Sequence, residues 1–545
     1  MKKVVSFILA ATLVLLPCFF AFAAQPAGVE TNAESYVAPQ RSHVKGQDLL
    51  DKIVRGLVKA VAVLIPGGPN FVSKDDMPTE GFMEGMADPA FSSAQGATWS
   101  AGFDTRSLIT APDDIIGKCY VGGTMSVMSK KYATAIEDDL TVHTLALSDG
   151  VNGTVVFVVL DCFGVSSPTV REIRSELADF SAENGIAAIN VSALHQHSAV
   201  DTMGLNGDLV GAVFVNPWKN LFGLRADNGQ NAEYMENLVA QSVASVKAAV
   251  GSMTEGALYY GTADATKYLY DKRQPFVNDP NFNRFRFVPS DGGKETWLVT
   301  SSIHCVGNGA AGTVITADYP YYAEQTVNAA GANCMFIMGA QQSNTLERNA
   351  DTVVGYTDDM DRLDSLKGFG YSIGSALTAI DNDVPVAPHL AAKYATVTVE
   401  LDNPILLLAG KTGLITNYVY REGTKRFIES EIGYMELGND LAFAFFPGEL
   451  APELAFGGCL GAEYSWSGTD WEYPSMQDIV NERDANRTLL PFSLSNDQLG
   501  YIVPDNNYIA FLAEESGSTE FVSVSRHAAS VMIEAFEDLI GGIGA

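Results

Sequence analysis

The sequence predicts an α/β fold in which a mixed sheet has helices on both faces, and two observations support this prediction. From about residue 101 onward, short and almost uninterrupted apolar runs alternate with longer helical stretches. Strands of this kind are buried on both sides, which requires helices above and below the sheet. At 47% hydrophobic residues, the chain also has enough apolar material to form a large core.

The predicted elements follow one another along the chain. Six apolar runs predict strands at 142–147, 154–161, 187–193, 297–303, 334–338 and 441–446. Five segments with helical periodicity predict helices at 168–184, 232–250, 319–330, 367–380 and 525–539. Segment 394–435 contains two stretches in which apolar and polar residues alternate, which predicts antiparallel strands.

The first 24 residues have the pattern of a secretory signal peptide. Lys2 and Lys3 precede an uncharged apolar stretch that ends in Ala21-Phe22-Ala23, a small-x-small cleavage pattern. A retained membrane anchor is the alternative, because the stretch is close to the length that spans a bilayer. Cleavage near Ala23 predicts a soluble protein that is secreted, periplasmic or held at the cell surface.

Residues 25–100 form a predicted N-terminal extension. Within it, residues 47–65 place apolar side chains at three- and four-residue spacing, which predicts an amphipathic helix that ends at Pro66. We favour a helix that packs on its own domain, and a helix that lies in a lipid interface is the alternative. Residues 66–100 are rich in Gly, Pro and Ser and predict a linker or an ordered extension, so the main domain is expected to span 101–545.

The charge and the cysteines exclude several classes of protein. The formal net charge is −31 at pH 7, which opposes binding to nucleic acid or to anionic lipid surfaces. We therefore expect no nucleic-acid partner. Six cysteines, one of them in the leader, are too few for a disulfide scaffold, and the absence of a CxxC spacing argues against a thiolate zinc finger.

Metal-binding types of side chain follow several of the predicted strands. His195 and His197 come directly after the third strand, His304 after the fourth and Glu449 after the sixth. In an open α/β sheet, sites form beyond the carboxyl ends of the strands. Histidines two apart in extended backbone can point to the same side. The sequence therefore predicts a His/His/Glu zinc site of the hydrolytic type, with one position left open for water. Other polar residues at such strand ends are Asp161, Gln341, Gln342 and Asn344.

Several segments resemble the neutral/alkaline non-lysosomal ceramidases. "SALHQHS" resembles the family's THTHSG segment, and "SSIHCVGNGAAGTVITADYPYYAE" resembles its HPT…SxDxxGYA segment. "DKRQPFVNDP" resembles NRSPxAYxxNP and carries Arg273. "FPGEL" resembles PGE and carries Glu449, and "LSNDQLGYIVPDNNY" resembles LSNxYxGYxxTxEEY and carries Tyr501. With "FDTRSLITAPDD", which is similar to the family's opening strand, these segments cover roughly residues 100–510 in the family's order.

The resemblance implies a secreted zinc-dependent hydrolase that cleaves the amide bond of an N-acyl sphingolipid or a related N-acyl lipid. One zinc ion would be bound by His195, His304, Glu449 and Tyr501. The implied partner is a small-molecule or lipid amide substrate, with transient contact to a membrane surface. The oligomeric state does not follow from the sequence.

The resemblance also assigns the remaining steps of an amide hydrolysis by metal-activated water. His197 would be the acid/base, Arg273 would orient the substrate, and Tyr501 or Arg273 would stabilise the developing oxyanion. Asp161 and Asp318 are candidates for the side chains that fix the histidine tautomers. Ordinary capping of strand ends is the alternative role for these two aspartates.

The chain departs from the family pattern in two places. The family's GDxSPN segment is "GAQQSN" here, with Ala340 in place of the aspartate and Gln342 in place of the serine, so a serine nucleophile is not expected. Only 44 residues follow Tyr501, so the C-terminal β-sandwich domain of the family is not expected either. Two other functions therefore stay open, namely a zinc hydrolase of a non-lipid amide or ester and a non-catalytic surface binding protein that keeps the fold.

Overall fold

The structure, a computed structural model, describes residues 36–543 apart from residues 66, 87–95, 124–130, 205, 207–208, 225, 227, 310–311 and 518. The predicted signal peptide at residues 1–24 lies outside the described residues. Among the helices of the described part, none is long and apolar enough to cross a membrane.

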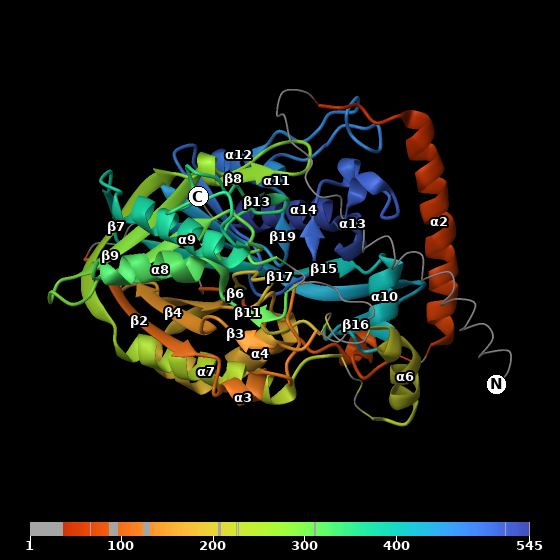
Figure 1. The fold of residues 1–545 in the computed structure, drawn as a ribbon, viewed down its shortest axis with the longest axis horizontal. Coiled ribbons are helices and arrows are strands. Elements are labelled where there is room, and N and C mark those ends of the chain that lie inside the picture. The colour runs from red at the N-terminus through yellow and green to blue at the C-terminus, as the bar shows by residue number, and fades with distance from the viewer. Residues whose placement is uncertain are drawn as a thin grey trace.

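Two mixed sheets form the centre of the fold (Figure 1). The larger sheet has the order β12-β10-β9-β7-β2-β4-β5-β6, with β14 paired to β7, and the smaller has the order β1-β16-β17-β18-β20, with β15 paired to β17. The strands of the larger sheet are β2 (Ser100–Ser107), β4 (Thr141–Ser148), β5 (Thr154–Leu160), β6 (Ile186–Ala193), β7 (Thr254–Asp264), β9 (Asn281–Pro289), β10 (Thr296–Ser301), β12 (Asn333–Met338) and β14 (Val384–Val386). Those of the smaller sheet are β1 (Phe71–Val72), β15 (Leu390–Glu400), β16 (Val419–Glu422), β17 (Lys425–Leu437), β18 (Leu441–Phe445) and β20 (Thr488–Phe492).

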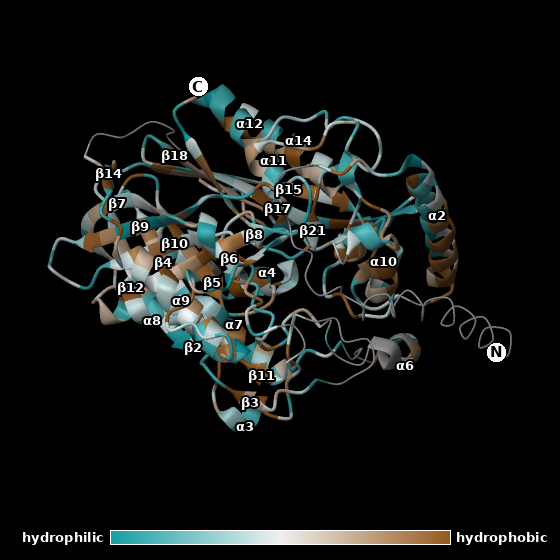
Figure 2. Cartoon of the chain, turned by 45° about the horizontal axis from the view of Figure 1, so that its top comes forward, coloured by the Kyte–Doolittle hydropathy of each residue, from teal (hydrophilic) through white to brown (hydrophobic). Residues whose placement is uncertain are grey.

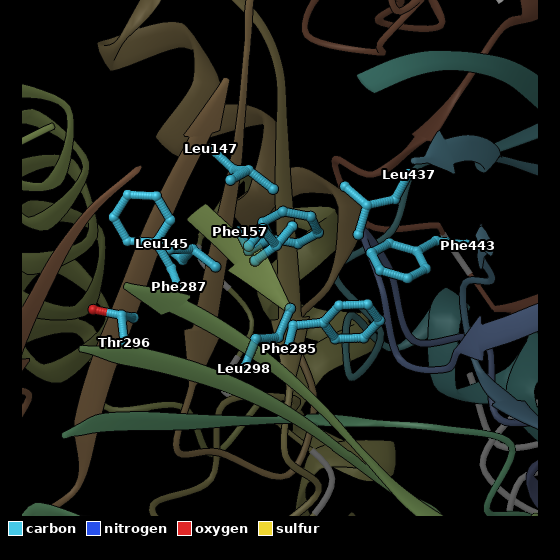
Figure 3. A pocket seen from close by; sticks show the side chains of 10 residues that line it. Leu145, Leu147, Phe157, Phe285, Phe287, Thr296, Leu298, Leu437 and Phe443 are labelled. Atoms are coloured by element: carbon cyan, nitrogen blue, oxygen red, sulfur yellow. The ribbon is translucent and has the colours of Figure 1, made fainter. Parts of the chain in front are cut away.

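The two sheets pack face to face, and their strands are rich in apolar residues (Figure 2). The ring of Phe443 in β18 lies 6.4 Å from that of Phe157 in β5 and 5.1 Å from that of Phe285 in β9, between ring centroids. Leucines from both sheets surround these rings, and the remaining cavity measures about 10 Å³ (Figure 3). Such a space holds about one water molecule at most. The layer between the sheets is therefore a packed core and not a ligand pocket.

Helices cover the outer face of each sheet. On the larger sheet, α7 (Ala232–Gly251) packs on β2 and β4, and α8 (Asp318–Ala329) packs on β12 with α9 (Arg362–Thr378) beside it. On the smaller sheet, α14 (Ala528–Gly541) packs on β15 and β17, and α12 (Met476–Arg483) packs on β20. The predicted mixed α/β class is confirmed. The helices cover a stack of two sheets, because the second face of each buried strand meets the other sheet and not a second layer of helices.

The predicted strands are present, and most predicted helices are shifted by only a few residues. The helix predicted at 168–184 is divided into α4 (Ser167–Glu176) and α5 (Ala178–Asn184), and Gly185 ends the second with a positive φ of 64°. The sequence pattern did not reveal β9, because this strand carries charged residues. Its Arg284 and Arg286 each lie 2.7 Å from a carboxylate oxygen of Asp383.

The N-terminal extension packs on the smaller sheet and its helices. The predicted amphipathic helix is α2 (Arg41–Leu64), which begins six residues earlier than expected. Its buried side chains, such as Val58, contact α10 (Pro404–Lys411) and Phe511, and Arg55 pairs with Asp51 beneath them. After the helix, β1 pairs with β16. The described parts of the extension are thus joined to the main body, while the opposite face of α2 is exposed.

Candidate metal centre

Curvature of the larger sheet brings the ends of distant strands together. His195 follows the edge strand β6, and His304 follows β10, which lies next to the opposite edge strand β12. The two edge strands β6 and β12 contact each other in space. Glu449 begins β19 (Glu449–Leu450), which follows β18 of the smaller sheet. Side chains from both sheets therefore meet at one place.

Three histidines and a glutamate form a tight cluster there. One ring nitrogen each from His195, His197 and His304 lie within 4.8 Å of one another. Nε2 of His304 lies 2.8 Å from Oε2 of Glu449, and Nε2 of His195 lies 3.2 Å from the same oxygen. A backbone hydrogen bond of 2.9 Å from the N–H of His197 to the carbonyl of Cys305 joins the two histidine segments.

Backbone carbonyls fix which nitrogen of each histidine faces the centre. Nδ1 of His195 lies 2.8 Å from the carbonyl oxygen of Phe163, and Nδ1 of His304 lies 2.8 Å from that of Asn344. A carbonyl oxygen can only accept, so each Nδ1 carries the hydrogen and each Nε2 of a neutral imidazole presents a lone pair.

Two lone pairs thus point at one carboxylate oxygen, that of Glu449. This arrangement requires positive charge at the centre, either on the imidazoles or on a bound cation. Nε2 of His195 also lacks a well-aligned hydrogen bond although it is buried, as expected of a metal ligand. Imidazole nitrogen with carboxylate oxygen is the donor set of hydrolytic zinc sites, so these residues fit zinc.

The electrostatics of the cluster separate the roles of its members. Burial alone would raise the pKa of Glu449, but the nearby imidazoles of His195 and His304 hold it well below its usual range. Burial lowers the pKa of His197 well below the ordinary value, and the two neighbouring histidines lower it further. Both ring nitrogens of His197 are buried and make no hydrogen bond of good geometry. The lowered pKa favours the neutral imidazole of His197, which has one nitrogen with a free lone pair.

The backbone is strained where it approaches the cluster. His195 has a φ of 61°, which is uncommon for a residue other than glycine and costs free energy. Gly123 has a φ of 84° and lies directly against His197, where a Cβ atom would be 2.3 Å from Cα of the histidine. Strain and close packing of this kind concentrate at functional sites. Sequence reasoning missed Gly123, although an adjacent pair of glycines at 122–123 was a visible signal.

Asp161 and Asp318 were candidates for fixing the histidine tautomers, with ordinary capping as the alternative, and backbone carbonyls occupy that place at Nδ1 of His195 and His304 instead. Asp161 accepts hydrogen bonds from the backbone N–H and the hydroxyl of Thr141, at 2.8 and 2.7 Å. Asp318 accepts from the backbone N–H of Tyr319 at 2.9 Å. Backbone carbonyls take the predicted role, and no side-chain pattern in a sequence marks such a carbonyl.

Tyr501 and Glu449 are paired residues on two neighbouring short strands. β21 (Tyr501–Ile502) pairs in parallel with β19, and Tyr501 is in register with Glu449. Residues in register emerge on the same face of a ladder. Arg273 is held differently, because its Nη1 lies 2.6 Å from Oε1 of the buried Glu520 and its Nη2 donates to the carbonyl of Asn507 at 2.6 Å. The zinc-ligand role of Tyr501 and the substrate role of Arg273 stay predictions.

Residues that follow members of the cluster in the sequence include buried polar groups and form a cleft. The side-chain amides of Gln341 and Asn344, which follow β12, are buried with unpartnered atoms. A cleft of about 310 Å³ opens beside α11 (Pro452–Phe456), the helix after Glu449. Its wall includes the buried Glu453, whose Oε1 has no hydrogen-bond partner and whose pKa burial raises to about 7.

The fold and the donor set define an α/β protein with a candidate histidine–carboxylate metal centre. No family model and no curated protein matches its sequence. Among solved structures, neutral ceramidase from Pseudomonas aeruginosa is similar with a TM-score of 0.60 and 14% identity, over 82% of this chain and 74% of that chain. A ceramidase complexed with C2 is similar with a TM-score of 0.58 and 13% identity, over 82% and 75% of the two chains. This protein therefore has the fold of neutral ceramidase, as the resemblance implied.

Proposed function

We propose that this protein is a zinc-dependent amide hydrolase that acts on an N-acyl sphingolipid or a related N-acyl lipid. The observation that carries the proposal is the approach of two Nε2 lone pairs, of His195 and His304, to one oxygen of Glu449. The shared fold supports the substrate class, because the similar structures are ceramidases and ceramide is an N-acyl lipid.

The proposed ligand set for one zinc ion has four members. His195, His304 and Glu449 would hold the ion, and Tyr501 would be the fourth protein ligand. When bound, zinc lowers the pKa of a water molecule to about 7 and polarises a carbonyl group. The hydrogen bonds from Nδ1 of both histidines to backbone carbonyls keep Nε2 available for this purpose.

The protein's own residues move the protons. His197 takes a proton from the attacking water and later delivers it to the leaving nitrogen, so that an amine and a carboxylic acid are released, and the acid then loses its proton to solvent. General acid–base catalysis of this kind contributes typically about 10²–10⁴-fold to a rate. The buried amides of Gln341 and Asn344 are suited to hold the substrate amide. Ala340 and Gln342 stand where a serine nucleophile would be expected, and attack by water needs no such residue.

We also propose that the chain is exported and that residues 1–24 are removed. The sequence of the leader supports this, with Lys2 and Lys3 before an apolar stretch that ends in Ala-Phe-Ala. Mass spectrometry of the protein from its native host should find an N-terminus near residue 24. An intact Met1 in the mature protein would contradict cleavage and favour the retained anchor.

A second candidate function is that of a non-catalytic binding protein. The observation that favours it is the buried ion pair between Arg273 and Glu520, because a guanidinium in such a pair is less available to a substrate. A hydrolase of short soluble amides or esters also stays open.

One experiment separates these functions. Protein purified without chelators is analysed for zinc and then assayed for fatty-acid release from a panel of ceramides and for cleavage of short soluble amides and esters. We expect about one zinc per chain and release of fatty acid, both lost in His304→Ala. Absence of zinc after supply in excess would refute the metal centre. Zinc without any turnover would indicate a binding protein, and turnover of soluble substrates alone would indicate the other hydrolase.

A further inference from the structure

The outward face of α2 is apolar and exposed. Leu49, Ile53 and Leu57 are 60%, 52% and 50% exposed, and Leu64 at the end of the helix is 59% exposed. The opposite side of the helix is apolar too, and there its valines pack against the body. A helix on a protein surface needs one apolar stripe for packing. Among the residues that the structure describes, the second stripe is therefore not needed for packing.

α6 (Leu209–Leu221) and the residues after it extend this apolar face. Trp218, Leu221, Phe222 and Leu224 are 50%, 59%, 72% and 59% exposed. Figures 1 and 2 both show α6 beside the C-terminal end of α2. A Cβ atom at Gly68, just beyond α2, would lie 3.5 Å from the side chain of Asn220. More than half of the exposed large apolar side chains in the described part of the chain lie on these two segments.

A row of lysines borders the exposed stripe. Lys45, Lys52 and Lys59 are exposed and seven residues apart, about two helical turns, so they lie along one line of α2. Within the described residues, none of the three has an ion pair or a side-chain hydrogen bond. The acidic residues of the helix face the body instead, since Asp51 pairs with Arg55 and Asp48 accepts a hydrogen bond of 3.0 Å from Trp466. This face is thus locally basic in a chain of net charge −31.

We propose that the docking face, formed by the exposed side chains of α2 and of segment 215–224, binds the surface of a phospholipid membrane. The apolar side chains enter the interface, and the lysines lie on the lipid phosphates, as in helices that lie parallel to a membrane. Trp218 is of the residue type enriched at that depth.

The exposed lysines of α2 favour a membrane surface over a second copy of the chain as the binding partner of the docking face. None of the exposed residues of α2 is acidic, so a second docking face offers the lysines no partner, whereas lipid phosphates do. The proposal does not depend on hydrolysis, although docking would bring a lipid amidase to its substrate. The predicted contact with a membrane surface is thereby assigned to particular residues.

Vesicle flotation of the mature chain tests the proposal, with phosphatidylcholine vesicles and with an equal mixture of phosphatidylcholine and phosphatidylglycerol. The apolar variant is Leu49→Ser/Ile53→Ser/Leu57→Ser. We expect it to lose binding to both vesicle types by about tenfold for each side chain. The control variant is Val151→Ser/Tyr371→Ser/Val384→Ser, whose side chains are 48%, 41% and 54% exposed elsewhere. It should bind as the wild type does.

A charge variant, Lys45→Gln/Lys52→Gln/Lys59→Gln, tests the second part of the argument. We expect it to lose about fivefold in binding per lysine on the anionic vesicles and little on pure phosphatidylcholine. Since every altered side chain is exposed, thermal unfolding and zinc content should match those of the wild type.

Three results would overturn the proposal: no binding of the wild type to either vesicle type, equal binding by all variants, or a dimer in sedimentation that only the apolar variant dissociates. The last result would make the face an interface between two copies. Flotation needs no turnover, so a protein that binds vesicles and hydrolyses nothing would refute the proposed hydrolase and leave the docking face intact.

Discussion

Replacing Gly123 by alanine should lower the rate of the proposed hydrolysis about 100-fold without removing the proposed zinc ion. A Cβ atom at this position would lie 2.3 Å from Cα of His197 and 2.6 Å from its Cβ. To reach an ordinary contact of about 3.4 Å, the backbone of His197 must move by about 1 Å. A displacement of that size at a reacting group costs about 10²-fold in rate. The φ of 84° adds a strain of roughly 1–2 kcal/mol for a residue with a side chain.

The matched control is Gly117→Ala. Gly117 has a φ of 74°, close to that of Gly123, but no atom lies within 4 Å of a Cβ built there. The control therefore carries the backbone strain without the collision. The assay combines fatty-acid release from ceramide, zinc content and the free energy of unfolding in urea. We expect about one zinc in both variants and a rate about 100-fold lower in Gly123→Ala alone.

The same pair of variants decides what His197 does. If His197 is the acid/base, moving it leaves the zinc ligands in place. Loss of zinc from Gly123→Ala, with zinc retained in Gly117→Ala, would instead make His197 a ligand and contradict the assignment. Equal rates in the two variants would refute the steric reasoning itself.

Three further predictions concern the metal, a buried carboxyl and the core. Zinc bound at the proposed site should raise the free energy of unfolding by about 2.7 kcal/mol when free zinc is at about 100 times Kd. Thermal unfolding with and without chelator measures this difference, and His304→Ala should abolish it. Burial raises the pKa of Glu453 from 4.5 to about 7, so the folded state keeps a proton that the unfolded state releases, and stability falls as the pH rises across that window. The free energy of unfolding should fall by about 3 kcal/mol at most between pH 4 and pH 8, as measured by urea titrations. This fall should be absent in Glu453→Gln, and an unchanged pH slope in that variant would contradict the prediction. Phe443→Ala should cost about 3–5 kcal/mol in urea unfolding, because the ring fills the layer between the sheets, and a cost below about 1 kcal/mol would show that the layer is loosely packed.

Six strands (β4, β5, β6, β10, β12 and β18) could be predicted because each lies in a run of apolar residues that is almost completely buried. The stacking of two sheets could not, since a strand such as β18 has the same pattern whether a helix or a second sheet covers it. The charged strand β9 was not predicted, because its arginines pair with Asp383, which is distant in the sequence. The hydrophobic pattern of a strand indicates that the strand is buried. It does not indicate whether a helix, a second sheet or a distant charged partner covers it.

The candidate site was predictable where it depends on residue type and not where it depends on the backbone. His195, His304 and Glu449 stood out because imidazoles and a carboxylate at strand ends are uncommon. The carbonyls of Phe163 and Asn344 could not be predicted, because every residue has a carbonyl and only the fold aims it.

The candidate metal centre contains side chains from both sheets. His195 and His304 come from the larger sheet and Glu449 follows a strand of the smaller one. Without positive charge, the two lone pairs at 3.2 and 2.8 Å from a carboxylate oxygen would push the strand ends apart. With a cation bound among them, the same atoms would hold these strand ends together. Because the proposed ligands come from different sheets, binding of a metal should stabilise the closed arrangement of these strand ends.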